Sequence, residues 1–250
     1  MRHNLFKIHG GKYYLAKWII SHFPPHKHYV EGCLGAGSVF YNKPYVPSTL
    51  YESNFNIWCI HYYLKFIEKN IQSIGASPEE FEKWKEFQPT SNPEIGLREY
   101  ILRKMSRVGD KTTFSQTKRL RGGRPEHVNS WENSKDKLPH FVNLAHKATV
   151  KWDTFYNHNF TPDTLVYVDP PYLHDTRTTT DEYGPHEWTE NDHINLVDFA
   201  KHTPAMWFIS SYPHEIYDGL GWKCHTKVMK NNSAQTKNKS ERIECLWTNT

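Results

Sequence analysis

The chain has 250 residues, of which 37% are hydrophobic and 23% charged, and its formal net charge is +4. This length allows one sizeable core with an inserted subdomain, and no apolar run approaches the length that crosses a bilayer. No hydrophobic segment follows the N-terminus, so we expect neither a membrane protein nor a secreted one.

The cysteines are scattered and contain no Cys-x-x-Cys pair, which argues against a structural zinc site and a disulfide framework and fits a reducing cytoplasm. They are Cys33, Cys59, Cys224 and Cys245. The 16 histidines contain no His-x-x-x-His pair on a convincing helix. We therefore expect no bound metal.

Within residues 5–20 a helix is predicted after Gly10 and Gly11, because Leu15, Trp18 and Ile19 recur at helical spacing. Gly10 and Gly11 let the backbone approach a ligand at the helix start, where free N–H groups and the helix dipole favour an anion. Lys12 adds a cation there. A carboxylate would suit this position, and a plain turn with a surface lysine is the alternative.

Residues 28–31 are predicted to form the first strand, followed by a glycine-rich turn at Gly35-Ala36-Gly37. The turn lacks the third glycine of the dinucleotide fingerprint, so a pyrophosphate ligand is not implied. Residues 49–52 form a second short strand that ends in the acid Glu52. An acid at this position holds ribose hydroxyls in nucleoside-binding α/β folds. An amphipathic helix is expected over 54–70.

Residues 75–147 lack β-rich runs, and we predict that they form an insertion between two halves of an α/β sheet. Between positions 98 and 124, nine Lys or Arg stand against two acids, a local net charge of +7 in a chain that is otherwise −3. Such a localised basic block is typical of a contact with a polyanion. A solvated, charged helix face is the alternative.

A helix is predicted from the capping residue Ser91 to Gly109, with Arg98, Arg103 and Arg107 away from its buried face. The basic loop that follows contains Gly122 and Gly123, which let the backbone come close to a phosphate. Its arginines can pair with phosphates or guanine edges. The candidate contacts in and before this loop are Arg107, Lys118, Arg119, Arg121 and Arg124.

Residues 165–168 are a short apolar run typical of a buried strand in a parallel sheet. Pro170 and Pro171 cannot continue a strand ladder, so the strand should end at Asp169. The pattern therefore places a carboxylate and the ring of Tyr172 at the carboxyl edge of a sheet, where open α/β folds bind ligands.

Acids end three of the candidate strands, because residues 148–153 form a further strand that ends in Asp153. The other two acids are Glu52 and Asp169. The carboxyl ends of parallel strands meet at one crevice, so we predict a ligand site formed by these three acids.

The remaining elements complete an alternating α/β pattern. They are a polar loop over 173–180 that could be a lid, a helix that begins at Thr189, a buried strand over 205–211, and two final strands over 222–229 and 242–247 that form a hairpin.

These motifs and their order resemble the Dam-type DNA adenine-N6 methyltransferases, especially the small solitary members of phages and prophages. The most specific pieces are Asp169-Pro170-Pro171-Tyr172 and Gly35-Ala36-Gly37, with the basic insertion between them. The resemblance covers nearly the whole chain. It implies an α/β fold: a Rossmann-like, seven-stranded methyltransferase sheet with an antiparallel last strand, and an inserted, mainly helical target-recognition subdomain.

The implied domains are a catalytic domain, 1–74 and 148–250, and a DNA target-recognition insert, 75–147. The implied setting is the cytoplasm of a bacterial or phage-infected cell, where such enzymes also serve restriction-modification.

The resemblance implies S-adenosylmethionine (AdoMet) as the cofactor. Lys12 would face its methionine carboxylate, Glu52 would hold the ribose hydroxyls, and Asp153 the amino group of its adenine. The implied cofactor-binding residues are Lys7, Gly11, Lys12, Gly35, Ala36, Gly37, Glu52, Asp153 and Asp169. The chain departs from the family pattern at one place. The glycine turn usually begins with Pro-Phe in the family, whereas this chain has Gly32 and Cys33 at these positions.

Double-stranded DNA is the implied substrate. Asp169 and the Pro170 carbonyl would accept hydrogen bonds from the exocyclic amine of a flipped adenine, and Tyr172 would stack on that base. Residues in stretches similar to the phage-type members join the DNA-binding candidates; they are Asn129, His174 and Arg177.

Other acceptors remain open. The N4 of cytosine, an adenine in RNA or a protein glutamine presents a similar planar amine. Asp169, where Asn or Ser could stand, favours adenine, and the basic insertion disfavours a protein substrate. A non-catalytic nucleic-acid-binding module on the same fold is the alternative from another functional class.

Overall fold

The computed structural model describes residues 3–177, 183–230 and 241–250. The chain divides into two compact units. The first consists of Met1–Ser21, Leu34–Tyr45 and Glu52–Asp153, and the second of His22–Cys33, Val46–Tyr51 and Thr154–Thr250. The predicted lid lies partly, and the loop of the final hairpin almost wholly, outside the described residues. In the described part of the chain, no helix combines the length and the apolar character needed to span a bilayer.

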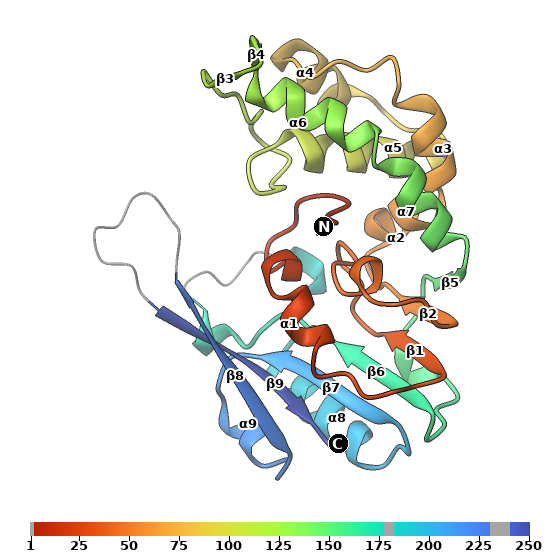
Figure 1. Ribbon diagram of the computed structural model, residues 1–250, viewed down its shortest axis with the longest axis vertical. Coiled ribbons are helices and arrows are strands. Elements are labelled where there is room, and N and C mark those ends of the chain that lie inside the picture. Colours follow the sequence, from red (N-terminus) through yellow and green to blue (C-terminus); the bar gives the residue numbers. More distant parts are fainter. Residues whose placement is uncertain (1–2, 178–182, 231–240) are drawn as a thin grey trace. The chain divides into compact units, whose positions relative to one another are not determined.

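A seven-stranded sheet has the strand order β5-β2-β1-β6-β7-β9-β8 (Figure 1). Its strands are β1 (His28–Glu31), β2 (Ser48–Tyr51), β5 (Ala148–Lys151), β6 (Thr164–Val168), β7 (Met206–Ser211), β8 (Lys223–Lys230) and β9 (Glu241–Thr248). Strand β1 runs parallel to β2 and β6, and β6 runs parallel to β7. Strand β9 lies antiparallel between β7 and β8. The α/β fold, the antiparallel last strand and the final hairpin are therefore confirmed.

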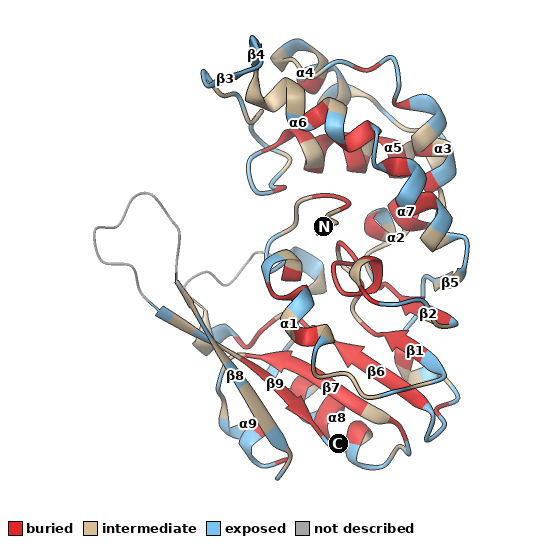
Figure 2. Cartoon of the chain, in the orientation of Figure 1, coloured by how far each residue is buried: buried red, intermediate tan, exposed pale blue. Residues whose placement is uncertain are grey.

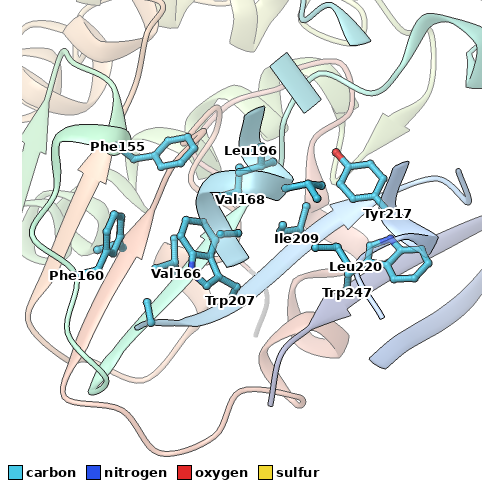
Figure 3. Close-up of a cluster of buried hydrophobic side chains, with 14 of the residues drawn as sticks. Phe155, Phe160, Val166, Val168, Leu196, Trp207, Ile209, Tyr217, Leu220 and Trp247 are labelled. Carbon is cyan, nitrogen blue, oxygen red and sulfur yellow. The ribbon is translucent and has the colours of Figure 1, made fainter. Parts of the chain in front are cut away.

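The second unit is organised around β6, whose five residues are all buried (Figure 2). Successive side chains of a strand point to opposite faces. Val166 and Val168 accordingly join the hydrophobic core on one face together with Trp207 and Ile209 of β7 (Figure 3). Helix α8 (Glu190–Lys201) covers this face with a set of apolar side chains that includes Leu196.

The start of α8 agrees with its prediction. Thr189 is the N-cap, and its side chain accepts a hydrogen bond from the Asp192 backbone while the Asp192 carboxylate accepts one from the Thr189 backbone. Both groups satisfy N–H donors that a helix start leaves unpaired. The second unit also contains short elements, η3 (Phe155–Asn157), η4 (His174–Thr176), η5 (Gly184–His186) and α9 (Glu215–Asp218).

The first unit is mainly helical, and residues 75–147 within it are mainly helical as predicted. It contains η1 (Lys12–Tyr14), α1 (Ala16–Ile20), η2 (Phe40–Asn42), α2 (Phe55–Tyr62), α3 (Leu64–Asn70), α4 (Pro78–Glu86), α5 (Asn92–Met105), α6 (Glu126–Lys135) and α7 (Leu138–Ala145). The basic loop adds a two-stranded hairpin, β3 (Leu120–Arg121) and β4 (Arg124–Pro125), which the sequence pattern did not indicate.

Two helix predictions need correction. The single helix expected over 54–70 is broken at Tyr63, whose φ of −100° and ψ of 24° end α2, so that α2 and α3 each pack against α5. Helix α5 ends at Met105 and not at Gly109. Arg103 is buried on α5 and pairs with Glu99 at 2.7 Å. It is not exposed as expected, because α5 buries more than one face against α2, α3 and α4.

Candidate active site

The glycine turn after β1 depends on two residues with left-handed backbone. Gly35 has φ +49° and Gly37 has φ +64°, a region that side chains with a Cβ rarely occupy. A Cβ at Gly37 would also come within 2.7 Å of the Tyr41 ring. At Gly35 the corresponding space is open, with only the Ile8 side chain at 3.8 Å. The half-buried Gly35 is therefore loosely packed on this side, which leaves room for a close approach to its backbone.

Glu52 lies directly after β2 and holds this turn. Its Oε2 accepts the Gly35 backbone N–H at 2.8 Å, and its Oε1 accepts the Asn54 backbone N–H at 2.8 Å. The side chain is buried, and burial raises the pKa of Glu52, an effect that the two N–H donors and the Arg103 guanidinium oppose. Each carboxylate oxygen keeps a second lone pair, so Glu52 can still accept hydrogen bonds from ribose hydroxyls.

A buried histidine on α2 fixes the other side of the same turn. His61 Nε2 is 2.8 Å from the Gly35 carbonyl oxygen, and His61 Nδ1 is 2.9 Å from the Tyr41 hydroxyl. A carbonyl oxygen can only accept, so Nε2 carries the proton, and Tyr41 donates to Nδ1. Burial lowers the pKa of His61 to about 4, which keeps the ring neutral. The backbone of Gly35 is thus hydrogen-bonded on both sides of its Cα, through its N–H and through its C=O.

The N-terminal lysines differ in their surroundings. Lys12 is buried, and its Nζ donates to the Gly10 carbonyl at 3.0 Å. The Nζ of Lys7 donates to the Ser106 carbonyl at 2.8 Å, so it contacts the residue that follows α5. Burial lowers the pKa of Lys7, and Asp110 opposes the shift. Of the other predicted cofactor residues in this unit, Asp153 and Gly11 are exposed and Ala36 is buried.

The second unit carries the motif Asp169-Pro170-Pro171-Tyr172 immediately after β6, where the sequence places it. Tyr172 is 7% exposed, and its hydroxyl donates to Glu244 Oε2 at 2.8 Å. Burial raises the pKa of Tyr172 well above its usual value, and the nearby carboxylates of Glu244 and Asp169 add to this effect. The acid and the ring of the motif are therefore close to one another.

The backbone of the motif has a neighbour on α8. His193 is fully buried, and its Nδ1 lies 2.6 Å from the Tyr217 hydroxyl. Burial lowers the pKa of His193 to about 4, an effect that the Asp192 carboxylate and the Pro171 backbone oppose. A neutral imidazole therefore lies near the backbone of Pro171.

Glu52 and Asp153 belong to the first unit and Asp169 to the second. Their convergence on one crevice stays a prediction. Among the described residues, no group of three or more His, Cys, Asp or Glu side chains is placed to bind a metal ion.

The hairpin β3–β4 presents the arginines of the basic loop. Gly122 and Gly123 have φ +60° and +76°, which suits a tight two-residue hairpin turn. Arg121 and Arg124 are opposite one another in the ladder, and both are exposed. Like charges in directly opposed positions repel, and neither arginine forms an ion pair with any described residue. The pair is thus suited to an anionic partner.

Other predicted DNA contacts lie near this hairpin. Asn129 Nδ2 donates to the Arg121 carbonyl at 2.7 Å, so this side chain braces the hairpin. Arg119 approaches Glu126 at 3.7 Å. Lys118 and Arg107 are exposed.

The two predicted DNA contacts in the second unit, His174 and Arg177, both interact with Glu187. Arg177 Nη2 pairs with Glu187 Oε2 at 2.6 Å and its side chain is 6% exposed, while His174 Nε2 is 3.3 Å from the same oxygen. In this arrangement the Arg177 guanidinium is engaged within the protein.

Sequence reasoning did not find His61, His193 or Glu244. His61 lies between apolar residues of α2, and His193 of α8 is followed by the buried Leu196 and Val197 at helical spacing. A histidine on the apolar face of a helix is the signal that could have marked both. No local pattern marks Glu244, because its partner is 72 residues away in the chain.

The strand order, the accessible glycine turn braced by an acid after β2, and the acid-proline-proline-aromatic motif after β6 together define a Rossmann-like methyltransferase. The sequence match is more specific. A model of the D12 class N6 adenine-specific DNA methyltransferases matches residues 9–94 and 85–217. The chain belongs to this family. It is an adenine-N6 DNA methyltransferase, its substrate is DNA, and its methyl donor is AdoMet.

Solved structures provide more distant similarities. Precorrin-6y C5,15-methyltransferase from Geobacter metallireducens GS-15 is 8% identical, with a TM-score of 0.41, 94% of this chain covered and 87% of that chain. SMU.472, a putative methyltransferase complexed with SAH, is 13% identical, with a TM-score of 0.36, 95% of this chain covered and 52% of that one. Curated proteins yielded no match.

Proposed function

We propose that this enzyme methylates the N6 of an adenine flipped out of a specific duplex sequence, with the donor bound by the first unit and the target base by the second. The observation that carries this proposal is the position of Asp169 and Tyr172 directly after β6, with the Tyr172 ring fixed through its hydroxyl. The family match gives no support to cytosine, RNA or protein acceptors, or to a non-catalytic module.

The residues of the first unit fit the donor. The open backbone at Gly35 suits a close approach by the methionine part of AdoMet, and the buried Lys12 ammonium suits its carboxylate. The buried Glu52 suits the ribose hydroxyls. Lys7, Gly11, Ala36, Gly37 and Asp153 complete the proposed donor site of this unit. Asp169, the remaining predicted donor residue, belongs to the second unit and is assigned to the acceptor in this proposal. When bound, AdoMet supplies a methyl group on a positively charged sulfonium.

The residues of the second unit act on the acceptor. The lone pair of the adenine amine is delocalised into the ring, so the amine is a poor nucleophile. Asp169 and the Pro170 carbonyl accept hydrogen bonds from its N–H groups, which draws the nitrogen toward a tetrahedral geometry and orients its lone pair. Asp169 polarises the amine, and deprotonation before attack is unnecessary. Tyr172 holds the flipped base by stacking, which contributes roughly 1–3 kcal/mol.

The basic insertion holds the duplex. Backbone phosphates supply most of the non-specific affinity of a protein for DNA, and the exposed Arg121–Arg124 pair suits two phosphates or a guanine edge. Arg107, Lys118, Arg119, Asn129, His174 and Arg177 are the further proposed contacts. In this proposal, residues 75–147 recognise DNA, and residues 1–74 and 148–250 form the catalytic domain. The proposed setting of the enzyme is a bacterial or phage-infected cell.

A transfer assay tests the proposal. Purified protein is incubated with labelled AdoMet and a set of duplexes of varied sequence, and the modified base and its motif are then located by long-read sequencing. We expect N6-methyladenine within one short motif. Label on cytosine, on RNA alone or on no duplex at all would overturn the proposal.

A further inference from the structure

The aromatic residue of the Asp169–Tyr172 motif is held by a strand from the end of the chain. Tyr172 donates its hydroxyl hydrogen to Glu244 Oε2 at 2.8 Å, and the two residues are 72 positions apart. Glu244 belongs to β9, whose pairing with β7 places Ser211 opposite Cys245 and Ser210 opposite Leu246. The position of this carboxylate is thus set by the sheet and not by a loop.

The backbone of the motif lacks the usual means of support. Pro170 and Pro171 have no N–H, so neither can donate to a strand ladder. Tyr172 follows them, beyond the end of β6 at Val168. A ring in this position keeps one orientation only if its side chain is fixed by other groups, because a free side chain has several rotamers.

Strand β9 fixes the ring from two positions on one face. Tyr212 packs its ring against Tyr172 at a centroid distance of 4.6 Å and an interplanar angle of 75°. Arg242 Nη1 in turn donates to the Tyr212 hydroxyl at 3.2 Å. Arg242 and Glu244 are two residues apart, so their side chains share a face of the strand. One strand therefore braces Tyr172 directly through Glu244 and indirectly through Tyr212.

We propose that Glu244 is a positioning residue for methyl transfer, which acts by holding the Tyr172 ring in the orientation that stacks on the flipped adenine. This inference rests on the proposed function, in which Tyr172 contacts the target base. Glu244 itself touches neither base nor donor in this scheme. The hydrogen bond between Tyr172 and Glu244 keeps the ring in one rotamer before the base arrives. Its loss should therefore lower the rate of methyl transfer and leave the affinity for AdoMet unchanged.

Three variants test how much the Tyr172–Glu244 hydrogen bond contributes to the rate of methyl transfer. Glu244→Ala removes the acceptor, Glu244→Gln keeps an acceptor oxygen at the same place, and Tyr172→Phe removes the donor but keeps the ring. Single-turnover methylation of a target duplex should fall roughly 10- to 100-fold in Glu244→Ala, because small misplacements of reacting groups have effects of this size. Tyr172→Phe should fall by a similar factor, and Glu244→Gln should stay within about threefold of the native rate.

The double variant separates positioning from general damage. If both substitutions break the same bond, Glu244→Ala combined with Tyr172→Phe should be no slower than the slower single variant. AdoMet affinity, measured by calorimetry, should remain within about twofold in every variant. The control is Glu241→Ala, an exposed acid on the same strand, which should leave rate and affinity unchanged.

A native transfer rate in Glu244→Ala, or fully additive losses in the double variant, would overturn the inference. If Glu244→Ala does not fold, the comparison of Glu244→Gln with Tyr172→Phe still decides the matter, since equal rates in these two would refute it. Tyr172→Ala distinguishes the two levels of the proposal. A native rate in Tyr172→Ala would remove the role of the ring itself, whereas a loss there without a loss in Glu244→Ala would remove only the role of Glu244.

Discussion

The Glu52 carboxylate and the Gly35 backbone N–H are joined by a 2.8 Å hydrogen bond, although 17 residues separate them. The acid after β2 therefore has a structural task before any ligand binds. It fixes a left-handed glycine whose backbone is loosely packed on one side. In the proposed donor site, where Glu52 also accepts from the ribose hydroxyls, this one residue would link the shape of the turn to recognition of the nucleoside.

Replacement of Glu52 should weaken the donor complex. Glu52→Ala removes the acceptor of two backbone N–H groups, and hydrogen bonds to a charged group contribute roughly 1.5–3 kcal/mol. We expect AdoMet affinity, measured by calorimetry, to fall about 10- to 100-fold. Glu86→Ala, which removes an exposed acid on α4 of the same unit, is the matched control. Unchanged affinity in Glu52→Ala would show that the turn and the ribose are held by other groups.

The neutral state of His61 should make stability depend on pH. Burial lowers its pKa from 6.5 to about 4 in the folded state. Below pH 6.5 the unfolded chain binds a proton that the folded chain does not, so stability falls as the pH drops toward 4 and is fully present above about 7. Between pH 7.5 and pH 5 this one histidine should account for a loss of about 2 kcal/mol.

Urea denaturation of native protein and of His61→Gln at these two pH values measures that contribution. The variant should lose about 2 kcal/mol less than the native protein on going from pH 7.5 to pH 5. His202→Gln, which replaces an exposed histidine on the surface of the second unit, is the control and should keep the full native loss. Equal losses in native protein and His61→Gln would mean that His61 is not neutral when folded.

Asp169 should matter for transfer and not for the structure of the donor site. Asp169→Ala removes an acceptor for the target amine, and we expect methylation to become undetectable while AdoMet binding is retained. Activity is measured by label transfer to duplex DNA, and binding by calorimetry. Asp163→Ala removes an exposed acid of the same unit that pairs with Lys27, and it should be fully active. Native activity in Asp169→Ala would refute the assigned role.

Local sequence patterns are sufficient to predict a structural feature that depends on a single short segment of the chain. The apolar run before Asp169 and the two prolines after it specify both the strand β6 and its end. Gly35 and Gly37 likewise mark a turn, because few other residues adopt a positive φ. These predictions needed no knowledge of distant parts of the chain, so the location of the motif and of the turn was available from sequence.

Features that depend on packing between distant segments could not be predicted in this way. The break at Tyr63 and the burial of Arg103 follow from the packing of α2 and α3 on α5. The partner of Tyr172 follows from the register of β9. His61 was missed for the same reason, since a histidine in an apolar stripe has a specific role only when a carbonyl such as that of Gly35 lies opposite it.

The arginine pair of the β3–β4 hairpin should control the salt dependence of DNA binding. Each phosphate contact contributes about one unit to the slope of log affinity against log salt concentration. Arg121→Ala and Arg124→Ala should each weaken binding and reduce that slope by about one. Fluorescence anisotropy with a labelled duplex over a salt series measures both quantities.

The control for this prediction is Lys83→Ala. Lys83 is an exposed cation on α4 of the same unit, but it pairs with Glu80 at 3.4 Å and lies outside the basic block. Its loss changes the net charge by the same amount, so a general electrostatic effect would alter its slope as much as that of the arginine variants. A reduced slope in Lys83→Ala, or a native slope in both arginine variants, would contradict a direct phosphate contact at the hairpin. The expected pattern is a lower slope in the arginine variants alone, because only these two side chains project from the glycine turn without an ion-pair partner among the described residues.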